Sequence, residues 1–125
     1  GVVVDLSSLV SMNLEIPYRE NAGDRAYFDL RLAPSFSMRR ANGAVIDRAR
    51  FLDDMKSGGE RVGLPLAQVS VFGQSRALVA CQVRVGVAVY DNIRLFVREV
   101  SAPDGWLLMS WANEPVVPAD GGERT

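Results

Sequence analysis

The chain has 125 residues, of which 48% are hydrophobic and 23% are charged, and its formal net charge at pH 7 is -1. A chain of this length forms one domain and buries roughly two-thirds of its unfolded surface, which is enough for a hydrophobic core. A net charge so close to zero provides no field to attract phosphate, so nucleic acid is not an expected partner. The apolar runs fall far short of the roughly 20 residues that a membrane-spanning helix needs, and no membrane partner is expected.

The chain contains one cysteine, Cys81, and no histidine. A single cysteine cannot form an internal disulfide and fits a reducing compartment, so we expect a cytoplasmic protein. Without histidine there is no Ser-His or Cys-His nucleophile, and one cysteine cannot complete an ordinary zinc site. We expect no metal and no cofactor, and any catalysis must use carboxylate, tyrosine, lysine or arginine.

Two helices are predicted at the start of the chain. Apolar residues from Leu6 to Tyr18 recur at helical spacing, and this helix either begins near Asn13 or kinks at Pro17. Asp24 is the expected N-cap of the second helix. That helix is expected to bury Tyr27, Phe28 and Leu32 and to end at Pro34.

A short hairpin and a third helix follow. Phe36 and Met38 alternate with polar residues over positions 35–40, and Asn42-Gly43 is a strong turn signal before positions 44–46. Asp47 is the expected cap of a helix that runs to about Ser57, before Gly58-Gly59. Two charged pairs, Asp53-Asp54 and Glu60-Arg61, are interpreted as a solvated face.

The apolar period changes to two from Ala67 onwards, which predicts long strands. Positions 69–71 lead to a turn at 73–75, and the next strand, over 77–85, is expected to be central, with Val79, Cys81 and Val83 on one face. The chain is expected to reverse between Gly86 and Asp91. Positions 92–98 and 105–115 then form a last hairpin.

The register of the last hairpin depends on its loop. A four-residue loop at positions 102–105 would pair Ser101 with Trp106, Phe96 with Trp111 and Arg94 with Asn113. One face then carries two aromatic rings with an arginine and an asparagine beyond them. Such a face suits a small-molecule pocket, but paired aromatic rings are also common in a core or at a dimer contact, and these alternatives stay open.

The domain boundaries are set by the polar end of the chain. Residues 1–117 are expected to form the single domain, and residues 118–125 are expected to be a disordered tail because they have nothing to bury.

Positions 39 and 40 are consecutive arginines on a strand, so only one of them can face inwards. If Arg40 does so, it needs a carboxylate partner or an anionic ligand; the alternative is that both arginines are surface charges.

The order of helix, helix, short hairpin, helix and long antiparallel strands resembles the cone-shaped α+β fold of the nuclear transport factor 2-like superfamily, which is cystatin-like. Local sequence also resembles the SnoaL-like branch of that superfamily, which includes domains of unknown function. The segments that carry the resemblance are Ala33-Pro34-Ser35-Phe36, Arg40-Ala41-Asn42-Gly43-Ala44-Val45-Ile46-Asp47-Arg48 and Asn92-Ile93-Arg94-Leu95-Phe96-Val97-Arg98. The resemblance covers about residues 5–115 and implies three helices packed on a strongly curved antiparallel sheet.

The resemblance implies a cone whose interior can hold a ligand or a reaction centre. In the ketosteroid isomerases and polyketide cyclases of the superfamily, a carboxylate or histidine inside the cone moves a proton. The isomerases' base position falls at about Arg40 of this chain, and the last strands carry Arg94, Phe96, Trp111 and Asn113 where the cyclases' acid-base aspartate would be sought. We therefore expect no acid-base pair in the cavity.

The sequence leads to a cone-fold protein that binds a small apolar or anionic organic molecule and forms a homodimer through its sheet. The expected ligand-binding residues are Tyr18, Tyr27, Met38, Arg40, Arg94, Phe96, Trp111 and Asn113. For each of the two tyrosines the alternative is a phenol bonded to backbone or water. The alternative functions are a cofactor-free isomerase, dehydratase or cyclase, and a catalytically silent dimerisation module whose cone is filled by side chains.

Overall fold

The computed structural model describes residues 5–116, so the expected tail at 118–125 lies outside the described residues. The helices are α1 (Ser7–Ala22), α2 (Arg25–Asp29) and α3 (Arg48–Asp53). The strands are β1 (Leu32–Arg39), β2 (Val45–Asp47), β3 (Arg61–Gly63), β4 (Gln68–Phe72), β5 (Arg76–Val85), β6 (Ala88–Arg98) and β7 (Trp106–Pro115). Three helices on one curled sheet confirm the predicted α+β fold class.

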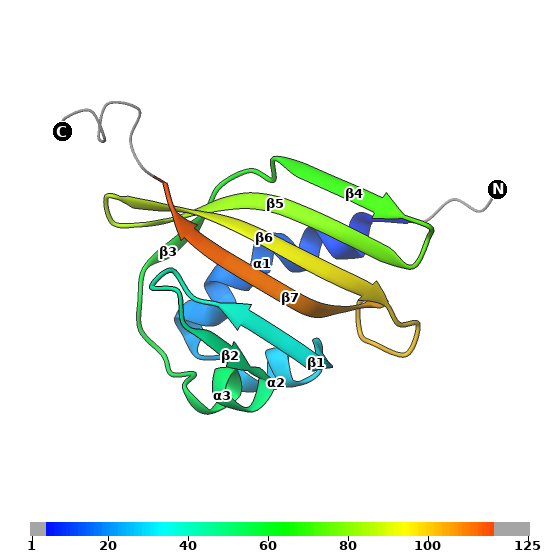
Figure 1. The fold of residues 1–125 in the computed structure, drawn as a ribbon, viewed down its shortest axis with the longest axis horizontal. Helices are drawn as coiled ribbons and strands as arrows, with labels where there is room; N and C mark the ends of the chain where they lie inside the picture. The colour runs from blue at the N-terminus through cyan, green and yellow to red at the C-terminus, as the bar shows by residue number, and fades with distance from the viewer. Residues whose placement is uncertain (1–4, 117–125) are drawn as a thin grey trace.

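The strands form one sheet in the order β2-β1-β7-β6-β5-β3, and β4 pairs with the remaining length of the β5 edge. Figure 1 shows α1 crossing one face of β5, β6 and β7, with α2 and α3 gathered near β1 and β2. All the pairs are antiparallel except β1 with β7, which run parallel, so the sheet is mixed. The cone interior lies between this sheet face and the helices.

Helix α1 runs through Pro17 without ending there, and it begins at Ser7 rather than near Asn13. Proline has no N–H, so the carbonyl of Asn13, four residues earlier, has no helical donor. Nη1 of Arg94 lies 3.5 Å from that carbonyl oxygen and also donates to Oδ1 of Asn13 at 3.1 Å. A cation from the sheet therefore takes the place of the missing helical hydrogen bond.

The second helix is shorter than predicted. Asp24 caps α2 as expected, since its side chain accepts a hydrogen bond from the N–H of Tyr27, but the helix ends at Asp29. Leu32 and Pro34 lie in strand β1 instead. The β1–β7 pairing shifts register between Leu32 and Ser37, and this irregular stretch accommodates a proline that cannot donate to the ladder.

The Asn42-Gly43 hairpin is confirmed: β1 and β2 pair antiparallel around it, and Gly43 has a φ of 92°. Asp47 caps α3 as predicted, but that helix ends at Asp53 and not near Ser57. Further along the chain, Arg61–Gly63 forms strand β3. This strand is not predictable from the sequence, because these residues show no apolar alternation.

The long strands follow the predicted alternation. Val79, Cys81 and Val83 are all buried on the inner face of β5, as expected. The reversal after β5 is tighter than expected, because only Gly86 and Val87 separate it from β6. The core lies between this face and α1, where Leu9, Met12 and Ile16 are buried.

The register of the last hairpin differs from the prediction. Arg98 pairs with Trp106, Phe96 with Leu108 and Arg94 with Trp111, and the register shifts between Leu95 and Phe96. The loop is longer than four residues, because Glu99 donates its N–H to the carbonyl of Gly105. The predicted pairs were wrong, but Arg94, Trp111 and Asn113 still share a face, because side chains alternate along a strand with a period of two.

No helix within residues 5–116 has the length and hydropathy to cross a membrane. Cys81 is buried and is not in a disulfide bond. The cytoplasmic location stays a prediction.

Candidate functional site

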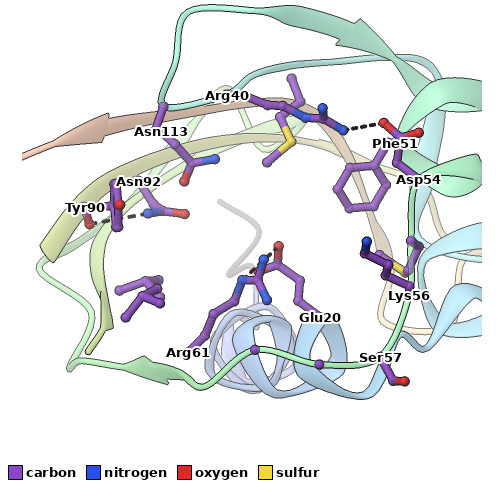
Figure 2. A pocket seen from close by; sticks show the side chains of 17 residues that line it. Glu20, Arg40, Phe51, Asp54, Lys56, Ser57, Arg61, Tyr90, Asn92 and Asn113 are labelled. Carbon is purple, nitrogen blue, oxygen red and sulfur yellow. Dashed lines mark hydrogen bonds and ion pairs between the residues drawn. The ribbon is translucent and has the colours of Figure 1, made fainter. Parts of the chain in front are cut away.

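A cavity of about 650 Å³ opens between the inner face of the sheet, the end of α1 and the segment that follows α3 (Figure 2). Its apolar lining comes from Met38, Phe51, Met55, Val83 and Val85. The charged residues that line it are Glu20, Arg40, Asp54, Lys56 and Arg61, and the polar ones include Ser57, Tyr90, Asn92 and Asn113. The volume lies in the range of small-molecule sites, roughly 300–1,000 Å³.

Glu20 and Arg61 face each other inside the cavity (Figure 2). Nε of Arg61 lies 3.6 Å from Oε2 of Glu20, and the Glu20 side chain is only 12% exposed. Burial raises the pKa of Glu20 to about 7, while the positive charges of Arg61 and Arg94 oppose the rise. A carboxyl group that titrates near neutral pH therefore lines the cavity.

Arg40 enters the cavity wall together with a carboxylate partner. Its Nη2 lies 2.6 Å from Oδ2 of Asp54, which also accepts a hydrogen bond from Nε of Arg50 at 2.8 Å. These two arginines lower the pKa of Asp54, so this carboxylate stays ionised. Arg40 thus has the carboxylate partner that an inward-facing arginine needs.

A buried polar cluster lies beneath the cavity wall. Oδ1 of Asn92 accepts hydrogen bonds from Nε1 of Trp111 at 2.7 Å and from Nη2 of Arg94 at 3.1 Å. The guanidinium carbon of Arg94 also lies 4.7 Å from the centre of the Trp111 ring. Arg94 is fully buried, and burial lowers its pKa. Of these three residues only Asn92 lines the cavity, so Arg94 and Trp111 support its wall from behind.

The predicted binding residues divide into three groups. Met38, Arg40 and Asn113 line the cavity, and their role in binding stays a prediction. Arg94 and Trp111 lie beneath the cavity, where the sequence analysis had expected them to line it. The remaining residues, Phe96, Tyr18 and Tyr27, lie elsewhere. Phe96 is fully buried in the core.

The two tyrosines of the helices do not reach the cavity. Tyr18 is half exposed, and its hydroxyl accepts a hydrogen bond from the N–H of Gly63 at 3.3 Å. It lies beside a smaller cavity of about 120 Å³ under α1, which Arg94 and Cys81 also line. Tyr18 therefore has the backbone partner that the sequence analysis gave as the alternative to ligand binding.

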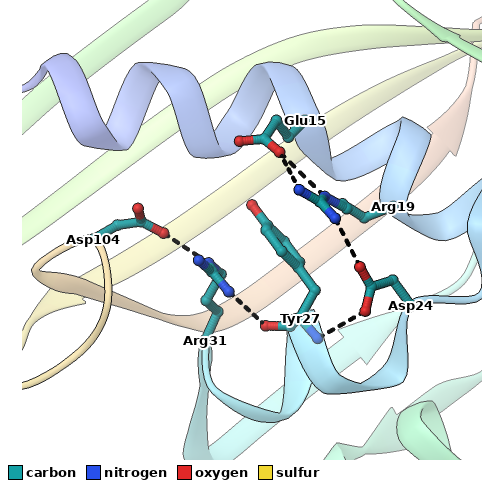
Figure 3. A network of polar contacts seen from close by, with 6 residues as sticks. All are labelled: Glu15, Arg19, Asp24, Tyr27, Arg31 and Asp104. Carbon is teal, nitrogen blue, oxygen red and sulfur yellow. Dashed lines mark hydrogen bonds and ion pairs between the residues drawn. The ribbon is translucent and has the colours of Figure 1, made fainter.

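Tyr27 belongs to a separate polar network that joins α1, α2 and the loop before β7 (Figure 3). Its ring lies between two guanidinium groups, with the carbon of Arg31 3.9 Å and that of Arg19 4.8 Å from the ring centre. Nε of Arg31 in turn donates to Oδ2 of Asp104 at 2.7 Å. These contacts tie three parts of the chain together away from the cavity.

Four of the charged residues in the cavity, Glu20, Asp54, Lys56 and Arg61, were not predicted to be there. Asp54 and Arg61 were interpreted as part of a solvated face, and Glu20 was not singled out. The prediction that the cavity holds no acid-base pair did not consider Glu20, which follows Arg19 in a charged stretch typical of an exposed helix face. The available signal was its position: Glu20 is four residues after Ile16 and so shares the buried face of α1.

Within residues 5–116, no group of three or more histidine, cysteine, aspartate or glutamate side chains is placed to hold an ion.

Comparisons of sequence gave no matching family model and no matching curated protein. Comparison of structures gave many similar folds. A domain of unknown function with a cystatin-like fold from Nostoc punctiforme superposes with a TM-score of 0.78 at 13% identity, over 99% of this chain and 85% of that one. A nuclear transport factor 2-like protein of unknown function from Silicibacter pomeroyi gives a TM-score of 0.70 at 14% identity, over 89% and 95%.

A third similar structure is the CaMKII hub of S. rosetta, with a TM-score of 0.73 at 17% identity, over 92% of this chain and all of the hub. Identities this low establish the fold and leave the activity open. The predicted nuclear transport factor 2-like fold is confirmed, and assignment to its SnoaL-like branch stays a prediction.

Proposed function

We propose that this chain, which has the nuclear transport factor 2-like fold, binds a small organic molecule with an apolar body and a negatively charged group. The observation that carries the proposal is the cavity lining, where cationic side chains face an apolar wall. Three positive charges line the cavity, on Arg40, Lys56 and Arg61. They are opposed by one negative charge on Asp54 and by a second one when Glu20 is ionised. A surplus of positive charge in a partly apolar cavity favours a carboxylate ligand.

The proposal is tested with a pair of small probes that differ in one group. We would measure binding of 3-phenylpropionate and of the neutral alcohol 3-phenylpropan-1-ol by ligand-observed NMR and calorimetry. The carboxylate is expected to bind at least tenfold more tightly, because only it can pair with the cavity cations. Arg61→Gln should remove most of that preference, whereas Arg84→Gln, a matched change at an exposed position on β5, should leave it unchanged. Equal binding of both probes, or of neither, would contradict the proposal.

Glu20 favours a second candidate function, a proton-transfer enzyme of the isomerase, dehydratase or cyclase kind. A carboxyl group with a pKa of about 7 is suited to act as acid or base at neutral pH, and Asn113 and Tyr90 in the same cavity could orient a carbonyl oxygen. The test is the exchange of the α-protons of 4-phenyl-2-butanone in D₂O. If the protein accelerates the exchange and Glu20→Gln abolishes this acceleration, the enzyme function is supported. If exchange is no faster than in buffer, the binding function remains.

We also propose that the chain forms a homodimer through the outer face of its sheet. The outer side chains of β5, β6 and β7 include Leu78, Ala80, Ile93, Leu95, Val97, Leu107 and Ala112, and none of these is buried. An apolar area of this extent on one face is unusual for a monomer. Likeness to a hub and to a kinase association domain from Exiguobacterium sibiricum is in line with self-association.

Sedimentation velocity at micromolar concentration tests the dimer. The wild type is expected to sediment with a mass of about 27 kDa, twice the 13.7 kDa of the chain, because the outer faces of two copies cover each other. Ile93→Lys places a charge in the middle of the face, where Ile93 is 44% exposed, and should give the monomer. A wild type that sediments as a monomer would exclude this interface. A silent dimerisation module is disfavoured, because the cone contains a cavity and is not filled by side chains.

A further inference from the structure

Among the ion pairs within residues 5–116, the pair between Glu20 and Arg61 has the longest separation. Its closest atoms are 3.6 Å apart, whereas Arg40 and Asp54 lie at 2.6 Å and Arg31 and Asp104 at 2.7 Å. The longer separation exceeds the 2.7–2.9 Å typical of a charge-assisted hydrogen bond. Arg61 therefore attracts Glu20 without forming a hydrogen bond to it, and its guanidinium retains capacity for another acceptor.

Arg61 is held in place by contacts that do not involve Glu20. The side chain of Asn21 forms a two-way clamp on its backbone, with Oδ1 accepting from the N–H of Arg61 and Nδ2 donating to its carbonyl, both at 2.9 Å. A Cβ at Gly59 would lie 2.8 Å from Nη1 of Arg61, so the guanidinium packs against bare backbone. The Arg61 guanidinium can therefore keep its position when Glu20 is neutral or is hydrogen-bonded to another group.

Both charge states of Glu20 are accessible near neutral pH. Burial opposes ionisation, and the charges of Arg61 and Arg94 favour it, which leaves the pKa at about 7. The other charged and titratable groups that line the cavity with it are Arg40 after β1, Asp54 and Lys56 after α3 and Tyr90 on β6. Cys81 on β5 lines the smaller cavity beside Arg94. Asp54 is ionised and Cys81 has a raised pKa, so neither titrates in the same range.

A carboxylate ligand on Arg61 would lie close to the Glu20 carboxyl group. Two carboxylates that share one cation repel each other, so a proton on Glu20 removes the repulsion and turns the group into a hydrogen-bond donor to the ligand. Since Arg40 is already paired with Asp54, Arg61 is the cation that protonation of Glu20 releases. Protonation of Glu20 therefore leaves Arg61 free to pair with one carboxylate group of a ligand.

We infer that the cavity binds an organic carboxylate on Arg61 together with a proton on Glu20, so that ligand affinity rises as the pH falls. The inference rests on the proposed function, and it adds the ligand class and the proton linkage. The chain suits its test because it has no histidine. Apart from the terminal amine, few groups other than Glu20 change charge between pH 6 and pH 8.5.

Calorimetry with 3-phenylpropionate, which is ionised throughout this range, gives the test. Affinity for the wild type is expected to fall about tenfold from pH 6 to pH 8.5. Titrations at pH 7.5 in phosphate and in Tris, which differ in heat of ionisation, should show a net uptake of more than half a proton per ligand. Glu20→Gln should bind with the same affinity at every pH and without proton uptake. Glu15→Gln, a matched change at an exposed position of α1, should behave as the wild type.

The two possible failures are distinguishable. Binding by the wild type with no proton uptake, or a Glu20→Gln variant that keeps the wild-type pH dependence, would overturn the inference and leave the proposed function intact. Absence of binding at every pH would overturn both. The proton uptake is measured on the wild type alone, so the inference remains testable if Glu20→Gln does not fold.

Discussion

Nε1 of Trp111 donates a 2.7 Å hydrogen bond to Oδ1 of Asn92, the residue directly across from Asn113 in the β6–β7 ladder. The bond joins a core aromatic ring to the one member of the buried polar cluster that lines the cavity. Arg94 donates to the same oxygen, so both neighbours fix the orientation of the Asn92 amide. The cavity wall at this point therefore depends on two side chains that do not line the cavity themselves.

Trp111→Phe is expected to destabilise the protein because it removes this bond and leaves the buried Asn92 oxygen with one donor fewer. Loss of a hydrogen-bond partner at a buried polar group costs about 1–3 kcal/mol. Trp106→Phe is the control, since Trp106 is equally buried and does not contact Asn92. In urea unfolding, the free energy of unfolding should fall by about 1 kcal/mol more for Trp111→Phe than for Trp106→Phe. Equal losses would mean that ring volume alone explains the effect.

Tyr27→Phe is expected to leave stability unchanged or to raise it slightly. The Tyr27 hydroxyl is buried and finds no hydrogen-bond partner within residues 5–116, and burial raises its pKa to about 12. Removing an unsatisfied buried polar group relieves a desolvation cost of about 1 kcal/mol or more. Thermal and urea unfolding check this. A clear loss of stability in Tyr27→Phe would show that the hydroxyl does make a favourable contact.

Arg31→Met provides the opposite case in the same network. It keeps much of the side-chain volume but loses the contact with the Tyr27 ring and the 2.7 Å bond to Asp104. We expect a loss of about 1–3 kcal/mol, because the pair is largely shielded from solvent and ties α2 to the loop before β7. Urea unfolding of Arg31→Met and Tyr27→Phe distinguishes the contribution of the Tyr27 ring to stability from that of its hydroxyl.

The sequence predicts the fold well because the fold depends on patterns that are local. The alternation around Val79 places a strand face, and Asn42-Gly43 places a hairpin, whatever the rest of the chain does. The face of Trp111 was also predictable, because a register error of two residues leaves side chains on the same side. Its pairing partner was not, since the loop length and the bulge depend on contacts formed in three dimensions.

The site was harder to predict because its charges come from segments far apart in the chain. Glu20 becomes buried only when residues 57–61 cross the end of α1, and no local pattern in either segment indicates that crossing. Arg40 could be selected because it directly follows strand β1 and continues the alternation that places Phe36 and Met38 inside. Asp54 follows the end of α3, and Arg61 begins the three-residue strand β3, which is too short for sequence spacing to give a direction for a side chain.

Glu20→Gln is expected to change the pH dependence of stability. The pKa of Glu20 is about 7 in the folded protein and about 4.3 in an unfolded chain, so between these values the folded state binds more protons. Stability from this group is therefore present at low pH and lost as the pH rises towards 7. Relative to Glu20→Gln, the wild type should lose about 2 kcal/mol between pH 5 and pH 8. Parallel pH profiles of the two proteins would show that Glu20 is not perturbed.

The crossing of residues 57–61 over α1 depends on Gly23, and Gly23→Ala should disrupt it. Gly23 ends α1 with a φ of 63°, and an added Cβ would clash with the backbone of Lys56 and Ser57. Gly86→Ala is a matched control, because Gly86 has a φ of 62° and nothing within 4 Å of the added atom. The control should lose about 1 kcal/mol, the usual cost of a left-handed conformation in a residue with a side chain.

Gly23→Ala should lose at least about 2 kcal/mol more than this control, because backbone atoms must move by several tenths of an ångström. The segment that moves also carries Arg61 into the cavity, through Gly58 bonded to Asn21 and through the Asn21 clamp. Binding of 3-phenylpropionate should therefore weaken in Gly23→Ala and stay unchanged in Gly86→Ala, both measured below their unfolding temperatures. If the two variants lose the same stability and bind alike, the close contact between Gly23 and Ser57 does not position the cavity cation.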